Sequence, residues 1–382
     1  MTFDFDTPVE RRGTSSVKWD KYAGRDILPL WVADSDFRSP PAVIEALARR
    51  VEHGVFGYGN PPAGLSETVV RTCAVEWNWA VDPAWLVWLP GLVSGLNVAC
   101  RAVGQTGDGV AALTPVYPPF LAAPSLMDRT LIGVPLGGDN TSGWRVDAAR
   151  LKAGLQDNCS LLLWCHPHNP VGRAWRRPEL EEVAEACLES RTVICSDEIH
   201  NQLILDPGVR HVPMATLGPE IASRTITLLA PSKAFNVAGL CCALAVIPDE
   251  DLRLRFRRAM AGIVPPVNVL GYVAALAAWG DDGRWLAAQN DYLRRNRDFL
   301  AAAVGALPGV TMSQVEATYL AWLDVGALGL GDAAGHFEAH GLGFTDGRHF
   351  AGSGHVRLNF GCSRSVLAEA CRRLAGAVAA AG

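Results

Sequence analysis

The stretch TITLLAPSKAFNVAGLCCALAV, residues 225–246, places one lysine between two apolar runs. The runs TITLL (225–229) and CALAV (242–246) have the length and the flanking turn residues of buried strands. Only four of the 34 Lys and Arg residues are lysine, and Lys233 is the one in this stretch. Arginine serves equally well as a surface cation, but it cannot replace an amine that must lose its proton. Lys233 is therefore a candidate for covalent chemistry, although a lone lysine is more often a solvated surface residue.

Five more short apolar runs precede this stretch and alternate with helix-like segments. They are WLVWL (85–89), GVAAL (109–113), LIGV (131–134), SLLLW (160–164) and TVIC (192–195). Segments such as RRPELEEVAEACLES (176–190) carry apolar residues at helical spacing. Strands that alternate with helices predict right-handed crossovers and a mainly parallel, seven-stranded sheet covered on both faces. We expect an α/β fold whose large domain spans residues 46–271.

The pattern changes after residue 271. WLAAQNDYLRRNRDFLAAAVGAL (285–307) predicts a long helix, and ATYLAWLDV (317–325) and HVRLNF (355–360) predict strands. A further helix, a Gly-rich turn and a closing helix complete this part of the chain. We therefore expect a second, smaller α+β domain, made of residues 272–382 and joined by the N-terminal segment 1–45.

Composition and charge argue against several classes of protein. The net charge is −5 with no basic stripe, whereas a nucleic-acid partner requires clustered Lys and Arg. The N-terminus lacks the apolar core of a signal peptide, and the longest apolar run, near 237–247, is about half of a membrane span. The ten cysteines are scattered and never form C-x-x-C, which indicates free thiols. We expect a cytoplasmic protein that binds neither nucleic acid nor a membrane.

Polar side chains follow the predicted strands where each one ends. The set is Tyr117 after 109–113, Asn169 after 160–164, Asp197 and His200 after 192–195, and Ser232 and Lys233 after 225–229. PGLVSGLN (90–97) opens a helix after 85–89. Ligands of open α/β sheets bind outside the carboxyl ends of the strands, so these residues are expected around one crevice. A Schiff-base lysine, a carboxylate for a ring nitrogen, an amide, a stacking ring and a helix N-terminus together suit pyridoxal phosphate.

Each of these residues has a simpler interpretation when taken alone. Asn169 before Pro170 is a frequent turn former, and Asp197 with Glu198 is an ordinary polar strand end or a metal-binding pair. The stretch HFEAH (336–340) has its glutamate in the wrong place for the zinc motif H-E-x-x-H. The glycine clusters at 57–64 and 329–335 only approximate a dinucleotide fingerprint. We therefore expect no metal site and no nucleotide-dependent dehydrogenase.

The order of motifs resembles that of the class I/II aminotransferases of pyridoxal-phosphate fold type I. Within them it is most similar to the cysteine-S-conjugate β-lyase (cystathionine β-lyase) branch. The similar segments run nearly from end to end: LPLWVADSDFRSPPAVIEAL (28–47), FGYG (56–59), PGLVSGL (90–96), TPVYPPF (114–120), HNPVGRAW (168–175), SDEIHNQLI (196–204), SKAFNVAGL (232–240), ATYLAWLD (317–324) and VRLNFGCSR (356–364).

The resemblance implies a role for each candidate residue. Lys233 forms a Schiff base with pyridoxal 5'-phosphate and then serves as the acid and base at the substrate α-carbon. The implied cofactor contacts are Asp197 at the pyridinium nitrogen, Asn169 at the phenolic oxygen, Tyr117 on the ring face, Ser232 with the backbone amides of Leu92 and Val93 at the phosphate, and His200 close by. Arg357 and Asn169 hold the substrate carboxylate. Tyr58 reaches into the site of the neighbouring subunit, toward cofactor and substrate, so a homodimer is implied.

Two positions favour elimination over transamination. Aspartate-type transaminases carry a phosphate-binding arginine where this chain has Cys241, and a tyrosine where it has His200. The resemblance thus implies a carbon–sulfur β-lyase that converts a cysteine S-conjugate or a cystathionine-like thioether to thiol, pyruvate and ammonia. An aminotransferase is the alternative. A tailoring lyase for a bulky S-conjugate is another, because Ser35 replaces a usual methionine in a segment expected to line the substrate pocket.

Overall fold

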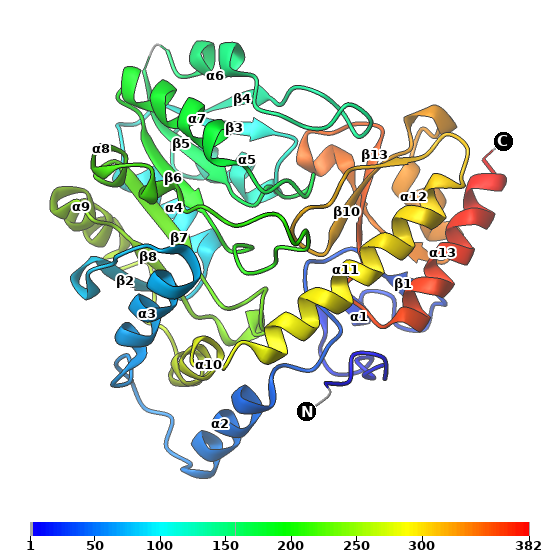
Figure 1. Cartoon of the computed structure of the whole chain (residues 1–382), viewed down its shortest axis with the longest axis horizontal. Coiled ribbons are helices and arrows are strands. Elements are labelled where there is room, and N and C mark those ends of the chain that lie inside the picture. Colours follow the sequence, from blue (N-terminus) through cyan, green and yellow to red (C-terminus); the bar gives the residue numbers. More distant parts are fainter. Residues whose placement is uncertain (1–2, 157, 382) are drawn as a thin grey trace.

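Seven strands form one sheet in the computed structural model, which describes residues 3–156 and 158–381 (Figure 1). The strand order is β2-β8-β7-β6-β5-β3-β4. The strands are β2 (Leu86–Leu89), β3 (Gly109–Thr114), β4 (Thr130–Pro135), β5 (Cys159–Cys165), β6 (Val193–Asp197), β7 (Thr225–Leu229) and β8 (Ala243–Val246). Only β8 is antiparallel to its neighbours β2 and β7, and the other pairs are parallel. All seven predicted strands belong to this sheet, which confirms the predicted mainly parallel α/β fold.

Helices cover both faces of the sheet, because successive strand residues alternate between two apolar cores. Val110 and Ala112 of β3 belong to a core with helices α4 (Leu92–Ala102), α5 (Pro118–Leu126) and α9 (Glu250–Met260). Ala111 and Leu113 belong to the opposite core, with α6 (Ala148–Gly154), α7 (Arg177–Glu189) and α8 (Pro219–Ala222). Burial on both faces explains why these strands are apolar along their whole length instead of alternating with polar residues.

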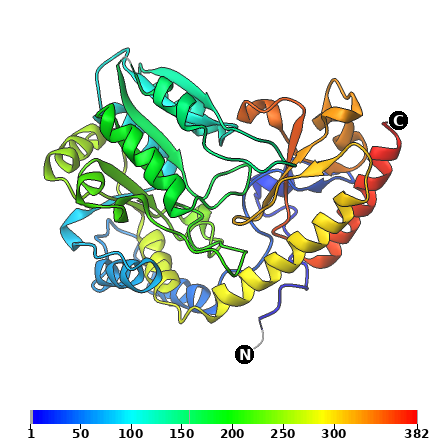
Figure 2. The same ribbon diagram turned by 45° about the horizontal axis from the view of Figure 1, so that its top comes forward.

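A second, antiparallel sheet lies beside the first (Figure 2). Its order is β12-β13-β10-β9, with β9 (Thr311–Met312), β10 (Leu320–Asp324), β12 (Thr345–Asp346) and β13 (His355–Asn359). Its helices are α11 (Arg284–Gly305), α12 (Ala333–Ala339) and α13 (Arg364–Ala379), and both views show α11 running from the side of the large sheet to this small sheet. The long helix and the two strands predicted after residue 271 are confirmed. The boundary between the predicted domains, 46–271 against 1–45 with 272–382, stays a prediction.

The N-terminal part of the chain reaches both sheets. It contains α1 (Val17–Asp20), β1 (Leu28–Pro29), α2 (Pro41–Glu52) and α3 (Leu65–Trp77), and β1 pairs in parallel with β11 (Leu342–Gly343). Helices α2 and α3 pack on α10 (Val269–Trp279). Short 3-10 turns are η1 (Pro83–Trp85), η2 (Met214–Thr216), η3 (Ala238–Leu240), η4 (Gly326–Leu328) and η5 (Gly347–Phe350). Residues 31–37, called the strap below, have no regular secondary structure and hydrogen-bond to both Lys233 and β13.

Candidate active site

Lys233 lies in the turn that follows β7. Its Nζ donates a hydrogen bond of 2.6 Å to the carbonyl of Ala33 in the strap. Burial is the main effect on Lys233 and lowers the pKa of its amine to about 8. The carboxylate of Asp34 acts in the opposite direction and raises this pKa, Arg357 lowers it further, and Asp197 raises it. An ammonium group that loses its hydration is disfavoured relative to the neutral amine. The lysine is therefore available as a nucleophile close to neutral pH, which Schiff-base chemistry requires.

Asp197 and His200 lie at the carboxyl end of β6, the strand next to β7. Asp197 is buried, and its Oδ1 accepts a hydrogen bond of 3.1 Å from the backbone amide of Ile199. Burial raises the pKa of Asp197 to about 7, so this carboxylate is poised to gain from a cationic partner. Burial, together with Lys233 and Arg357, lowers the pKa of His200 to about 3, which leaves a neutral imidazole beside two cations.

Arg357 of β13 is buried and connects the small sheet to the large one. Its Nη1 donates to Asn169 Oδ1 at 3.1 Å, and its Nη2 donates to the Trp31 carbonyl at 2.9 Å. The guanidinium carbon lies 4.7 Å from the centre of the Phe350 ring, and the buried Nε has no hydrogen-bond partner in the described part of the chain. Burial lowers the pKa of Arg357 to about 10. A planar cation with unused donors is suited to a carboxylate ligand.

The remaining predicted contacts of the ring and phosphate lie at the same edge of the sheet. Tyr117 precedes α5, and its backbone amide donates to the Asn169 carbonyl at 3.1 Å. Burial raises the pKa of Tyr117, so its phenol stays neutral. Helix α4 begins at Leu92 and Val93, directly after β2, and Ser232 follows β7. Strands β2 and β7 are each antiparallel to β8, so their carboxyl ends lie at the same edge of the sheet. The N-terminus of α4 and the Ser232 hydroxyl therefore lie at that edge as well.

Tyr58 is not part of this cluster within its own chain. Its side chain is fully exposed, in the irregular segment between α2 and α3. The adjacent Val55 and Phe56 are more than half exposed as well. A contribution of Tyr58 to a site therefore requires a second subunit, as the resemblance implies, and it stays a prediction.

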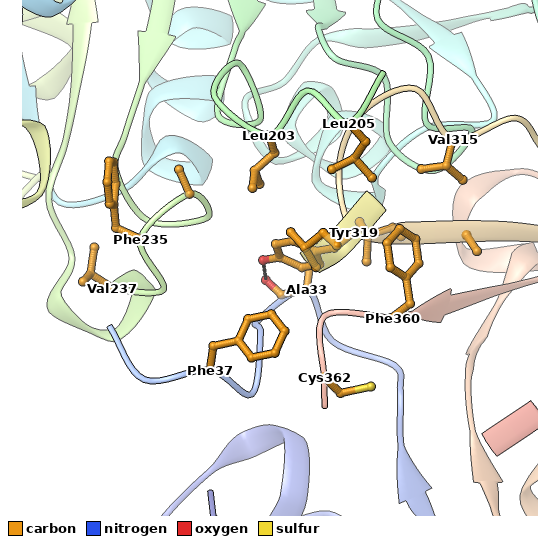
Figure 3. Packing of buried hydrophobic residues seen from close by; sticks show 14 of the residues in the cluster. Ala33, Phe37, Leu203, Leu205, Phe235, Val237, Val315, Tyr319, Phe360 and Cys362 are labelled. Atoms are coloured by element: carbon orange, nitrogen blue, oxygen red, sulfur yellow. Dashed lines mark hydrogen bonds between the residues drawn. The ribbon is translucent and has the colours of Figure 1, made fainter. Parts of the chain in front are cut away.

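Sequence reasoning missed Tyr319 and the carbonyl of Ala33. The Tyr319 hydroxyl donates to Ala33 O at 3.0 Å, so this carbonyl accepts from both Tyr319 and Lys233, and Figure 3 shows the tyrosine pointing to Ala33. Tyr319 belongs to the quoted segment ATYLAWLD, which was the available signal. Its direction depends on Thr318, whose φ of 73° is left-handed, and a sequence does not reveal such a conformation at a threonine.

Ser35 differs from its expectation as a pocket-lining side chain. It is only 1% exposed, and its hydroxyl has no hydrogen-bond partner among the described residues. A Cβ built on Gly361 would lie 3.3 Å from the Ser35 Cβ, so the serine packs against the backbone of that glycine. The strap reaches the candidate site through its backbone carbonyls, and the Ser35 side chain presents almost no surface to a ligand.

A second group of charges, called the paired set below, consists of the buried Lys18 and the partly buried Arg11, Asp34 and Asp36. Lys18 is fully buried, and its Nζ donates to Asp36 Oδ2 at 2.8 Å and to the Asp34 carbonyl at 3.1 Å. Arg11 donates to Asp36 Oδ1 at 2.6 Å and to Asp34 Oδ2 at 2.8 Å. Two cations thus meet two carboxylates on the strap. Sequence reasoning did not single out these residues, although Lys18 is one of only four lysines.

Glu198 is bonded to groups other than Asp197. Its Oε1 accepts from Ser196 Oγ at 2.8 Å and from the Met214 amide at 3.1 Å, and its Oε2 lies 2.7 Å from His211 Nε2. The interpretation of Asp197 and Glu198 as a metal-binding pair therefore has no structural support. Within residues 3–156 and 158–381, no group of three or more His, Cys, Asp or Glu side chains is placed to hold a metal ion.

Comparisons with known proteins agree with this geometry. The family model described as aminotransferase class I and II matches residues 25–374. The chain is 37% identical to cystathionine beta-lyase PatB of Bacillus subtilis (strain 168), over 98% of this chain and 100% of that protein. The crystal structure of OvoB is 47% identical, with a TM-score of 0.96, and covers 98% of this chain and 99% of its own.

Cystalysin from Treponema denticola, whose crystal structure contains pyridoxal 5'-phosphate, is 32% identical with a TM-score of 0.95. The alignment covers all of both chains. Matches of this extent establish the family without relying on any single motif. The chain therefore belongs to the class I and II aminotransferase family, in its carbon–sulfur lyase branch.

Proposed function

We propose that this protein is a pyridoxal-phosphate-dependent carbon–sulfur β-lyase that acts on a cysteine S-conjugate or a cystathionine-like thioether. The observation that carries the proposal is the partly buried Lys233, whose amine has a pKa lowered to about 8, beside the buried carboxylate of Asp197 and the buried guanidinium of Arg357. The similarity to PatB, which is named a cystathionine beta-lyase, favours the lyase reaction over the transaminase reaction.

The donor set fits pyridoxal phosphate. Asp197 is a buried acceptor with one hydrogen bond from the backbone, which leaves an oxygen for a protonated ring nitrogen. Asn169 Oδ1 accepts from Arg357, and its Nδ2 makes no hydrogen bond within the described residues, so a donor is left for the phenolic oxygen.

Other residues suit the ring face and the phosphate of the cofactor. Tyr117 supplies a neutral ring for stacking. Ser232 and the first amides of α4, at Leu92 and Val93, suit a phosphate. His200 completes the set as a neutral neighbour.

The residues of this chain divide the work of the reaction. When bound, pyridoxal phosphate supplies a conjugated, electron-accepting ring that makes the substrate α C–H bond acidic. Arg357 holds the substrate carboxylate and thereby orients that bond. The neutral amine of Lys233 accepts the α-proton. The C–S bond at the β-carbon breaks with both electrons on sulfur, and addition of water to the remaining fragment yields pyruvate and ammonia.

The test is to supply the purified holoenzyme with a cysteine S-conjugate and to measure thiol and pyruvate together. Equal amounts of both products are expected. The aminotransferase alternative requires the amino group to appear on an added keto acid with no thiol released, and that result would refute the lyase proposal. Conjugates of increasing size, assayed side by side, would show whether a bulky S-conjugate is preferred.

We also propose a homodimer in which Tyr58 serves the site of the partner subunit. The support is the exposed apolar segment around Val55, Phe56 and Tyr58, which has no cover within the described chain. The test uses two inactive variants, Tyr58→Ala and Lys233→Ala, co-expressed with different tags. The isolated heterodimer is expected to recover about half of the wild-type activity, since one of its two sites keeps both residues. An inactive heterodimer would contradict a shared site.

We also propose that the protein is cytoplasmic. All ten cysteines are free, and eight of them are buried. Free thiols persist in a reducing environment, which supports the cytoplasm. Among the described residues no helix is long and apolar enough to cross a membrane.

A further inference from the structure

The backbone carbonyls of the strap point in more than one direction, because the chain bends at Val32–Ala33 and again at Asp36–Phe37. Those of Trp31 and Ala33 face the candidate site, where Arg357 Nη2 donates to the first at 2.9 Å and Lys233 Nζ to the second at 2.6 Å. Each of these two carbonyls also accepts one hydroxyl. Thr345 Oγ1 donates to Trp31 O at 2.7 Å, and the Tyr319 hydroxyl donates to Ala33 O at 3.0 Å. In both cases one backbone carbonyl accepts hydrogen bonds from a cationic side chain and from a hydroxyl group.

Four further carbonyls of the strap each accept a hydrogen bond from one of two amide side chains. Asn359 of β13 is fully buried, and its Nδ2 donates to Val32 O at 2.6 Å and to Asp34 O at 2.8 Å. Asn236, three residues after Lys233, donates from its Nδ2 to Ser35 O at 3.1 Å and to Phe37 O at 2.7 Å. The strap is thus fixed from the small sheet by one amide and from the lysine turn by the other.

We propose that the strap is a hydrogen-bonding template for the reaction, in which Tyr319 is the positioning residue for Lys233 and Thr345 the positioning residue for Arg357. Each hydroxyl fixes the direction of a carbonyl, and each carbonyl fixes a cationic side chain. The proposal rests on the proposed function, because it takes Lys233 as the base and Arg357 as the carboxylate ligand. Small displacements of such groups are costly, since a misplacement of about 1 Å can lower a rate about 100-fold.

The two hydroxyls act on different events, which makes the template testable. Tyr319→Phe removes one hydrogen bond from the carbonyl that holds the amine. It is expected to lower kcat about fivefold and to leave KM nearly unchanged, given the usual contribution of a neutral hydrogen bond. Thr345→Val removes the hydroxyl from the carbonyl that holds the guanidinium. It is expected to raise KM about fivefold and to leave kcat nearly unchanged.

Two measurements without turnover separate positioning from general damage. The first is the rate at which Lys233 of the cofactor-stripped full chain captures added pyridoxal phosphate, followed by absorbance. The second is the affinity of the holoenzyme for a thioether carboxylic acid that lacks the α-amino group, measured by calorimetry. Tyr319→Phe is expected to slow the capture and to spare the affinity. Thr345→Val is expected to weaken the affinity and to spare the capture.

Matched controls exist elsewhere in the chain. Tyr292 is buried, and its hydroxyl donates to Asp6 Oδ1 at 2.6 Å and accepts from the Arg364 amide at 2.7 Å. Thr225 is fully buried in β7, and its hydroxyl donates to the Ile221 carbonyl at 2.7 Å. Neither residue hydrogen-bonds to the strap. Tyr292→Phe removes two hydrogen bonds, one more than Tyr319→Phe, and Thr225→Val removes one, as Thr345→Val does. Both controls are expected to lower the melting temperature without changing either measurement.

The proposal is overturned if both strap variants change both measurements alike, or if neither differs from its control. Failure of the proposed function gives a different result: the wild-type holoenzyme releases no thiol, while the two variants still separate in capture and in affinity. In that case the template stands and the reaction assigned to it is wrong.

Discussion

Two groups of buried and partly buried charges contact the strap, and their charges are arranged in opposite ways. In the paired set, Arg11 lies within 2.8 Å of a carboxylate oxygen of both Asp34 and Asp36, and Lys18 lies 2.8 Å from Asp36 Oδ2. In the candidate site, Lys233, Asp197 and Arg357 make no ion pair with any described residue, and Lys233 and Arg357 donate to neutral oxygens instead. The first group pairs its opposite charges with one another, whereas the second leaves its charges available to a ligand.

The difference separates a structural role from a chemical one. Ion pairs shielded from water are costly to break, and charges that are already paired offer little to a ligand. Buried charges without counterions have shifted pKa values, here to about 8 for Lys233 and about 7 for Asp197, and they gain when a ligand supplies the missing charge. Asp34 belongs to the paired set yet also acts on the pKa of Lys233, so it couples the two groups.

Removing the amine from the candidate site is expected to have the largest effect. Lys233→Ala should lower turnover about 10⁴-fold or more, because base and nucleophile are lost together. It should also abolish the visible absorbance of the lysine-linked cofactor. Circular dichroism should show an intact fold, since the lost side chain makes a single hydrogen bond within the described residues, to the Ala33 carbonyl. A variant that keeps this absorbance would refute the assignment of Lys233.

Breaking the paired set should act on stability. Lys18→Met leaves two carboxylates short of a cation, and the expected loss in the free energy of unfolding is about 3 kcal/mol. Urea unfolding followed by fluorescence would measure it. Lys152→Met is the matched control, since Lys152 pairs with Glu189 on the surface and should change the unfolding midpoint little. Equal effects of the two substitutions would contradict a structural role for the paired set.

The pH dependence of cofactor capture tests the unpaired character of the site. Capture requires the neutral amine, and burial lowers the pKa of Lys233 from 10.5 to about 8. The capture rate of the wild-type chain should therefore rise with pH through about 8 and level off above it. Stopped-flow absorbance between neutral and alkaline pH would locate the inflection. An inflection near the pKa of a free lysine would show that the site does not lower the pKa of the Lys233 amine.

The smallest expected effect tests the link between the two groups. The carboxylate of Asp34 favours the ammonium form of Lys233, so Asp34→Asn should move the capture inflection to a pH below that of the wild type. The same stopped-flow measurement applies. Asp206→Asn is a control, because Asp206 pairs with Arg297 instead of contacting the strap. An inflection that stays at the wild-type pH, or that moves to a higher pH, would show that the Asp34 carboxylate does not raise the pKa of Lys233.

The sequence by itself determined the sheet and the residues at its edge. Buried strands must be apolar along their length, so the seven runs were recognisable, and the rule that ligands bind at the carboxyl ends predicted a common location for Asn169, Asp197 and Lys233. The strands that carry them, β5, β6 and β7, are neighbours in the sheet. The antiparallel direction of β8 was not part of that prediction, because an apolar run reads the same in both directions.

Only the tertiary structure decided how the strap serves the site. Lys233 and Ala33 are 200 positions apart, and the bond between them uses a backbone carbonyl, which every residue type carries. Residue identity therefore gives no signal for such a contact. The hydroxyls of Tyr319 and Thr345 and the burial of Ser35 likewise depend on the direction of the backbone in three dimensions. The sequence specifies which side chains are available for chemistry, whereas the fold determines the positions of the backbone carbonyls that orient those side chains.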